Sequence, residues 1–230
     1  MNIRPAFVLF TLLIGHGISA QQWLWSRQIG GPGSEEVFIA GVDASSSVYL
    51  YGNYAWDIGS PPGFEDLYIA QDTLHGYRAG LLAKYEEDGD LAWVRNLTSP
   101  AGWLLLSSAV LDTLEEKLYV VGYYTLSCTL DTITLTAPFG GAFLSQWDLD
   151  GHCLWARNVA TNGYDPLYRT CEVGAVAFGT DGRLFVGGTT PQYGPNLLEG
   201  RLVPQGTFVV SYTPEGDTLW TRMIAQYEGI

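Results

Sequence analysis

Short runs of apolar, β-branched and aromatic residues, separated by turn signals, recur in the same order three times along the chain. An apolar run comes first, at residues 36–43, 104–111 and 171–178. A run closed by Gly follows at 48–52, 118–122 and 184–188, and after a polar connector a run opened by Gly stands at 80–85, 141–147 and 206–212. Runs of this length and composition, without a helical period, predict β-strands.

A fourth run carries the clearest signature: an acidic residue and Gly, then Trp and Arg two residues apart. It occupies residues 88–95, 150–157 and 215–222, and a copy without the turn, Trp25-Ser26-Arg27, stands near the start. The acidic-Gly pair predicts a tight turn, and residues two apart on a strand point to the same face. We expect the recurring tryptophans to be buried in the contacts between successive units.

The spacing of the tryptophans also indicates a repeat, because Trp25, Trp93, Trp155 and Trp220 are 68, 62 and 65 residues apart. A tandem four-stranded meander is the sequence form of a propeller blade. We therefore predict an all-β fold of β-propeller blades over residues 21–230, with units at about 28–95, 96–157 and 158–222. Three units and one leading strand fall short of a closed ring, which predicts an arc with an unpaired edge at the C-terminal end. Either the chain is a piece of a longer propeller, or two or more copies complete a ring by self-association.

The order of these segments resembles a known family. A strand ending in Tyr-x-x-Gly, a connector, Gly-x-x-Leu-x-Lys-Tyr, an acidic-Gly turn and Trp-x-Arg together are similar to the SBBP (β-propeller repeat) family of secreted bacterial proteins, over nearly all of residues 22–224. The resemblance implies propeller blades in an exported or surface protein that acts by binding or display. The units are longer here than in the family, and there are only three.

A second, weaker resemblance concerns Asp150-Gly151-x-x-x-Trp155, which is similar to the Gly-x-x-x-Trp element of quinoprotein-type (PQQ-like) propellers. Some of those proteins are dehydrogenases, but none of their quinone or calcium ligands can be carried over to a matching position. A glycosidase needs only two carboxylates at a suitable separation, so a glycan-cleaving enzyme also stays open. The alternative function is thus a propeller enzyme of the quinoprotein or glycan-cleaving class.

Residues 1–20 have the pattern of a cleavable signal peptide. Arg4 supplies the positive charge, residues 6–14 the apolar segment, and Ile18-Ser19-Ala20 a small-residue cleavage site. The apolar segment is too short to span a bilayer comfortably. The sequence predicts cleavage after Ala20 and a secreted, cell-surface or periplasmic protein with no membrane span after cleavage.

The charge is strongly acidic, with 24 Asp and Glu against 11 Lys and Arg and a net charge of −13. A polyanion would be repelled, which excludes nucleic acid and anionic lipid as partners. The three cysteines Cys128, Cys153 and Cys171 allow three alternative single disulfides and match no metal motif. His75 and His152 have no partner at a catalytic or metal-ligand spacing. We predict no cofactor, no metal and no catalytic residue.

The connectors offer the one candidate binding surface. Those between the second and third strands, at about 53–79, 123–140 and 189–205, and those that lead from one unit to the next, at about 97–103 and 159–170, are long, and a meander places them all on one side of the fold. We expect them to lack secondary structure and to carry function. Trp56, Trp103 and Tyr124 could form an aromatic platform for a glycan or a protein; alternatively, the connector aromatics pin their own loops to the blades. The predicted function is non-enzymatic surface recognition or display.

Overall fold

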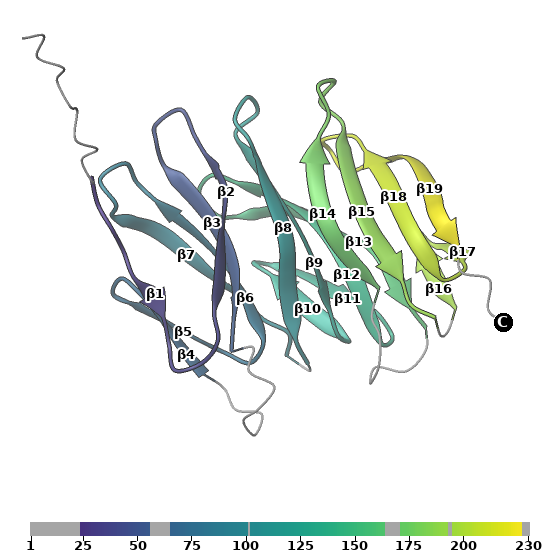
Figure 1. Cartoon of the computed structure of the whole chain (residues 1–230), viewed down its shortest axis with the longest axis horizontal. Coiled ribbons are helices and arrows are strands. Elements are labelled where there is room, and N and C mark those ends of the chain that lie inside the picture. The colour runs from purple at the N-terminus through teal and green to yellow at the C-terminus, as the bar shows by residue number, and fades with distance from the viewer. Residues whose placement is uncertain (1–23, 56–64, 101, 164–170, 193–194, 227–230) are drawn as a thin grey trace, which may run out of the picture.

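The computed structural model describes residues 24–55, 65–100, 102–163, 171–192 and 195–226. These residues form antiparallel β-sheets that stand side by side, none of them closed on itself, and no helix occurs among them (Figure 1). The predicted all-β class is confirmed. The expected signal segment, residues 1–20, lies outside the described residues.

Each predicted unit is an antiparallel meander in the predicted order. The first unit comprises β2 (Glu36–Val42), β3 (Val48–Tyr54), β6 (Ala79–Tyr85) and β7 (Leu91–Leu97). The middle unit comprises β8 (Leu104–Asp112), β9 (Lys117–Tyr124), β12 (Gly140–Asp148) and β13 (Cys153–Asn162). The third unit comprises β14 (Glu172–Phe178), β15 (Leu184–Thr190), β18 (Gly206–Tyr212) and β19 (Thr218–Gln226). All twelve strands overlap the runs that predicted them.

The acidic-Gly turns also form as predicted. Gly89, Gly151 and Gly216 have φ angles of +82°, +81° and +89°, a region that side chains with a Cβ rarely adopt. In each turn the glycine N–H donates to the carbonyl oxygen three residues earlier, at 2.9, 3.2 and 3.0 Å. The glycine therefore lets the third strand reverse directly into the Trp strand.

The connectors are not irregular, and here the prediction was wrong. Each contains a hairpin with a two-residue turn: β4 (Glu65–Ile69) with β5 (Asp72–Gly76), β10 (Ser127–Leu130) with β11 (Ile133–Thr136), and β16 (Asn196–Leu198) with β17 (Arg201–Val203). Their turns begin with Ala70, Asp131 and Glu199 at φ of 52°, 55° and 49°. Because these are not glycines, the turns carry little sequence signal.

Each connector hairpin reaches the last strand of the preceding unit. The β16 strand pairs with β13, and Thr129 of β10 bridges to Thr98 just after β7. In the first unit β4 pairs instead with β1 (Ile29–Gly30), which follows the turnless Trp25 copy. These hairpins lie together along one side of the fold, at the bottom of Figure 1, as the strand count predicted. In the described chain no strand pairs with the outer edge of β19.

Two of the three hydrophobic core clusters lie between units, and the third lies between the first unit's sheet, its connector hairpin and the N-terminal segment. We call each contact a seam, the face toward the following unit the rear face, and the face toward the preceding unit the front face. The first seam buries Leu82, Leu97, Leu104, Leu106, Leu118, Val120, Phe143 and Trp147. The second buries Tyr119, Leu144, Val159, Val176, Val186, Phe208 and Tyr212. A unit therefore depends on its neighbour to exclude water from its sheet.

Candidate functional site

The recurring Trp and Arg of one unit contact the acidic-Gly turn of the next. Trp93 donates from Nε1 to the carbonyl oxygen of Leu149 at 2.9 Å, and its ring lies so near Gly151 that a Cβ there would be 2.9 Å away. Arg95 stacks over the Trp93 ring and donates to the carbonyl oxygens of Gly151 at 2.8 Å and Asp150 at 3.0 Å. The signature thus closes the first seam through backbone carbonyls.

A similar arrangement recurs in the second seam, but without the indole hydrogen bond, since Trp155 Nε1 is buried and has no hydrogen-bond partner in the described part of the chain. The Trp155 ring lies against Gly216, where a Cβ would be 2.9 Å from it, and Arg157 donates to the Gly216 carbonyl oxygen. The predicted position of the tryptophans between units is confirmed here. Trp93 and Trp155 both stay partly exposed, however, because the turns they contact lie at the rim of each seam.

The second seam contains a buried ion pair that the sequence did not indicate. Arg157 Nη2 donates to Glu199 Oε2 at 2.5 Å, and the Glu199 side chain is only 8% exposed. Thr218 donates to the same oxygen at 2.7 Å, and the Tyr212 hydroxyl donates to Oε1. Burial and the neighbouring carboxylate raise the pKa of Tyr212 above its ordinary value, so its hydroxyl remains a donor. All of these donors converge on one carboxylate and tie the β16–β17 turn to the third unit.

The rear face of the third unit is the same surface, and no further unit packs on it among the described residues. Ile224 stands four residues after the recurring tryptophan, as Leu97 does in β7 and Val159 in β13. Leu97 and Val159 are 1% and 0% exposed, whereas Ile224 is 66% exposed. Within the described residues, Trp220 and Arg222 stack on each other but donate to no turn carbonyl. The third unit therefore presents an unused half of a seam.

The remaining residues of this rear face are small or apolar. Register pairs Ala177 with Phe185, Val209 with Arg222, and Ser211 with Trp220 across it. Phe185 and Val209 are partly exposed, while the residues at the same positions of the middle unit, Tyr119 and Leu144, are fully buried. The exposure therefore extends over the whole sheet and is not confined to one side chain.

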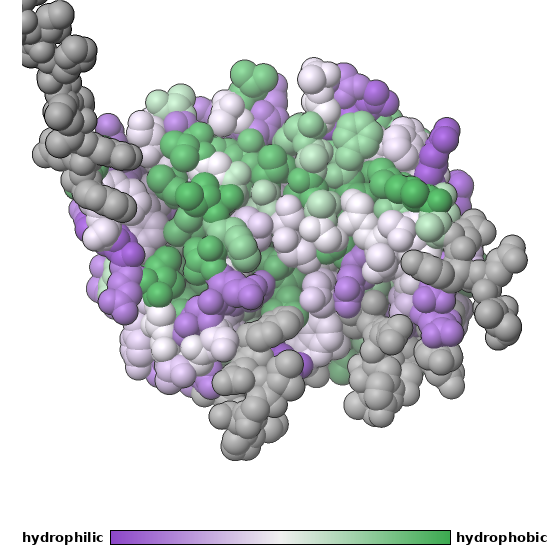
Figure 2. All heavy atoms as spheres, in the orientation of Figure 1, coloured by the Kyte–Doolittle hydropathy of each residue, from purple (hydrophilic) through white to green (hydrophobic). Residues whose placement is uncertain are grey.

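A groove of about 620 Å³ lies along the first strands of the three units, β2, β8 and β14, and reaches Val209 and Ile224 of this rear face. It is bounded by Glu36 and Phe38 of β2, by residues 105–107 of β8, and by the third unit up to Ile224. Figure 2 shows hydrophobic residues spread over this side, from β2 and β8 across to β18. Phe38 is 48% exposed. Since soluble monomers rarely expose large contiguous apolar surface, this groove is the candidate binding site.

The predicted aromatic platform does not form around Tyr124. Tyr124 is 0% exposed, packs in the first seam and donates from its hydroxyl to Asn158 Oδ1 at 2.7 Å, so it presents no ring to a ligand. Trp103 is partly buried and packs edge to face against Tyr123, with ring centroids 5.3 Å apart. Trp56 lies outside the described residues. Tyr124 therefore belongs to strand β9 and to the core of the first seam rather than to a connector.

Among the described residues, no three His, Cys, Asp or Glu side chains are grouped so that they could hold a metal ion. Cys128, Cys153 and Cys171 are free thiols in this structure, and burial raises the pKa of each to about 12. His75 Nδ1 lies 2.6 Å from Asp66 Oδ1 on the surface. Over the residues with defined positions, no helix is long and apolar enough to cross a membrane.

The chain matches no known family model, and no curated protein sequence matches it.

Proposed function

We propose that this chain is an exported, non-enzymatic repeat protein of the β-propeller type, similar to SBBP proteins, that acts in surface recognition or display by binding a protein. The observation that carries the proposal is the exposure of Ile224 at 66%, where the matching residues of the other two units are buried. The same surface that binds a neighbouring unit twice within the chain is presented once more without one.

The chemistry of the rear face favours a protein over a glycan. Its centre consists of Val209, Ile224 and small residues of β14 and β15, which offer a sugar few hydrogen-bond partners. The outer edge of β19 offers unpaired backbone groups, to which another strand can add. An apolar sheet face beside an open strand edge suits a β-rich protein surface. The signal-peptide pattern of residues 1–20 supports export.

Site-specific photocrosslinking in cells that export the protein tests this proposal. Val209→p-benzoylphenylalanine places the probe at the centre of the rear face, and Leu114→p-benzoylphenylalanine places it on a turn of the middle unit, where Leu114 is 91% exposed. We expect protein adducts from position 209 and none from position 114. If position 209 yields no protein adduct, the rear face is not a protein-binding site.

Activity assays distinguish the binding proposal from the alternative, a quinoprotein or glycan-cleaving enzyme. The purified protein is assayed for quinone-dependent alcohol oxidation and against a panel of glycosides. Glu36 and Glu172 are the carboxylates that line the groove. Turnover that Glu36→Gln or Glu172→Gln abolishes would replace the binding proposal with the enzymatic one.

A further inference from the structure

We infer that the rear face of the third unit binds the front face of the first unit in a second copy, so that two copies form one closed ring of six units. This inference rests on the proposed function, since it requires that the rear face bind a protein. It adds the identity of the partner and the atoms that meet.

The two seams within the chain define what the partner must present. Each seam supplies an acidic-Gly turn, whose carbonyl oxygens accept from the preceding Arg and whose Gly lies against the preceding Trp. Each also supplies an apolar front face behind that turn. Trp220 and Arg222 project the same donors from β19. A suitable partner therefore carries such a turn together with an apolar sheet face.

The first unit has both features. Its turn is at residues 86–89, where Gly89 has the required positive φ of +82°. Its front face is incompletely covered: Ile39 is 66% and Val42 49% exposed. In the third unit the matching positions are Val176, which is 7% exposed, and Phe178, and both pack in the second seam. At the centre of this face Leu81, Ala83 and Tyr85 are buried against the N-terminal segment that carries Trp25 and Ile29. The first unit thus presents a front face that its own chain covers only in part.

Only a short segment now occupies that turn. Trp25 donates from Nε1 to the Glu87 carbonyl oxygen at 2.8 Å and lies against Gly89. Trp93 contacts Leu149 and Gly151 of the next unit in the same way. Arg27 meets Asp90 at 3.3 Å in a surface pair whose side chains are 37% and 80% exposed, and such pairs contribute little. The segment continues into β1, a strand of two residues, whereas β19 has nine. A docking β19 would put Trp220 in place of Trp25.

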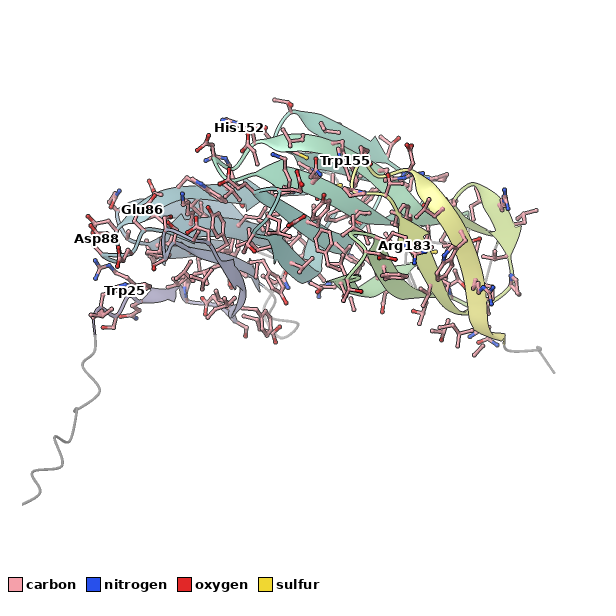
Figure 3. All side chains as sticks on the ribbon, turned by 90° about the horizontal axis from the view of Figure 1, so that it is seen from above. Trp25, Glu86, Asp88, His152, Trp155 and Arg183 are labelled. Atoms are coloured by element: carbon pink, nitrogen blue, oxygen red, sulfur yellow. The ribbon has the colours of Figure 1, made fainter. Side chains whose placement is uncertain are left out.

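The rear face of the third unit and the front face of the first lie at opposite ends of the molecule. Figure 3 shows Trp25, Glu86 and Asp88 together at one end and the third unit with Arg183 at the other. A contact between unlike faces closes into a ring when the rotations between units add up to a full turn, and otherwise grows without limit. Two copies of three units give six, within the four to eight blades that propellers use. A closed dimer is therefore the expected assembly.

The oligomeric state and a matched pair of variants test this inference. Light scattering on the purified protein should give the mass of two chains. Ile224→Lys should give a monomer with an unchanged circular dichroism spectrum. The side chain is 66% exposed in the single chain, so the lysine would be buried only in the contact between two copies. Leu114→Lys, at a position 91% exposed and remote from both faces, should remain a dimer. A monomeric parent protein, a dimer that Ile224→Lys leaves intact, or a ladder of larger species would each overturn the inference.

A disulfide trap tests the register. Arg95 donates to Asp150 within the chain, and the same offset in the second copy would pair Arg222 with Asp88. Arg95→Cys with Asp150→Cys is the intramolecular control. Mixing an Arg222→Cys chain with an Asp88→Cys chain should give crosslinked dimers under mild oxidation; failure of the mixture, where the control closes, contradicts the register.

The outcomes separate this inference from the proposed function. Crosslinks from position 209 to a different protein, with a monomeric purified chain, would keep the binding function and overturn the second copy as its partner. Crosslinks to the chain itself, together with the dimeric mass, support both.

Discussion

Trp93 on β7 donates its indole N–H to the backbone carbonyl of Leu149, 56 residues later, at 2.9 Å across the first seam. The bond joins the last strand of one unit to a turn of the next, and Arg95 adds two more bonds to the same turn. The most recognisable residues of the repeat therefore join units, which explains why they recur in register.

Removing the indole from a covered seam should cost more than removing it from the open face. In the monomeric Ile224→Lys background we expect Trp93→Ala to lower the free energy of unfolding by about 3 kcal/mol, since it deletes both a packed aromatic and a hydrogen bond. Trp220→Ala in the same background should cost less than about 1 kcal/mol, because its ring has no following turn to contact. Urea denaturation measures both, and equal losses would show that the seam contact contributes nothing.

The stability cost of replacing a turn glycine has two parts, backbone strain and a clash with the tryptophan, and two variants measure them separately. Gly182 has φ of +78°, and a Cβ at this position would meet nothing within 4 Å, so Gly182→Ala should cost only the strain of about 1 kcal/mol. Gly151 has a similar φ of +81° but lies against Trp93, so Gly151→Ala should cost about 2–4 kcal/mol in all. Thermal or urea unfolding gives the difference. If both variants lose the same stability, the ring does not restrict this position.

The buried carboxylate of Glu199 should be a stability determinant. Glu199→Gln keeps the size of the side chain but leaves Arg157 without its counter-ion in the second seam, so we expect a loss of about 2–3 kcal/mol. Glu215→Gln, an exposed acid on the neighbouring turn, should change the stability by less than about 0.5 kcal/mol. Parallel denaturant titrations compare the two, and a neutral Glu199→Gln would show that the ion pair does not stabilise the seam.

The cysteines should be unreactive in the folded protein. Burial raises the pKa of Cys128, Cys153 and Cys171 from an ordinary 9.0 to about 12, so at pH 8 the thiolate, which is the nucleophile, is scarce. We expect Ellman's reagent to label them only after urea is added. Rapid labelling of any one of them at pH 8 would contradict their burial.

The same thiols make stability depend on pH. In the unfolded chain they ionise near pH 9, while in the folded protein their raised pKa keeps them neutral until about pH 12. Their contribution is therefore complete below about pH 9 and is lost as the pH rises toward 12. Unfolding midpoints measured between pH 8 and 11 should fall, and replacing the three cysteines by Ala should reduce that fall.

The strand order could be predicted from the sequence because alternation and the acidic-Gly turns are local signals. The end of the second strand could not, since Gly52, Gly122 and Gly188 resembled terminators. A Cβ at these glycines would lie 2.3, 2.2 and 2.3 Å from a carbonyl oxygen of the neighbouring strand, so they are needed for close approach and the strand continues past them. Tyr124 then falls on the same face as Val120, two pleats on, which places it in the core rather than in a connector.

The connector hairpins were missed for a different reason. Their strands are three to five residues long, and Ala70, Asp131 and Glu199 adopt positive φ where a glycine would have marked the turn. The Glu199 ion pair was equally hidden, because Arg157 and Glu199 are 42 residues apart and meet only when β16 pairs with β13. Contacts between residues so far apart in the sequence form only when the units pack together, so local sequence patterns do not predict them.

The bonds that Trp93, Arg95 and Arg157 donate to the next unit's turn end on backbone carbonyls, and this frees the turn sequence to change. The residue that accepts from the tryptophan is Glu87 in one turn and Leu149 in another, and only the glycine is common to all three turns. A chain built this way can diverge at nearly every turn position and still assemble in the same order. Its relatives would then share spacing and glycines more than residue identity, and a unit could be gained or lost without redesigning its neighbours.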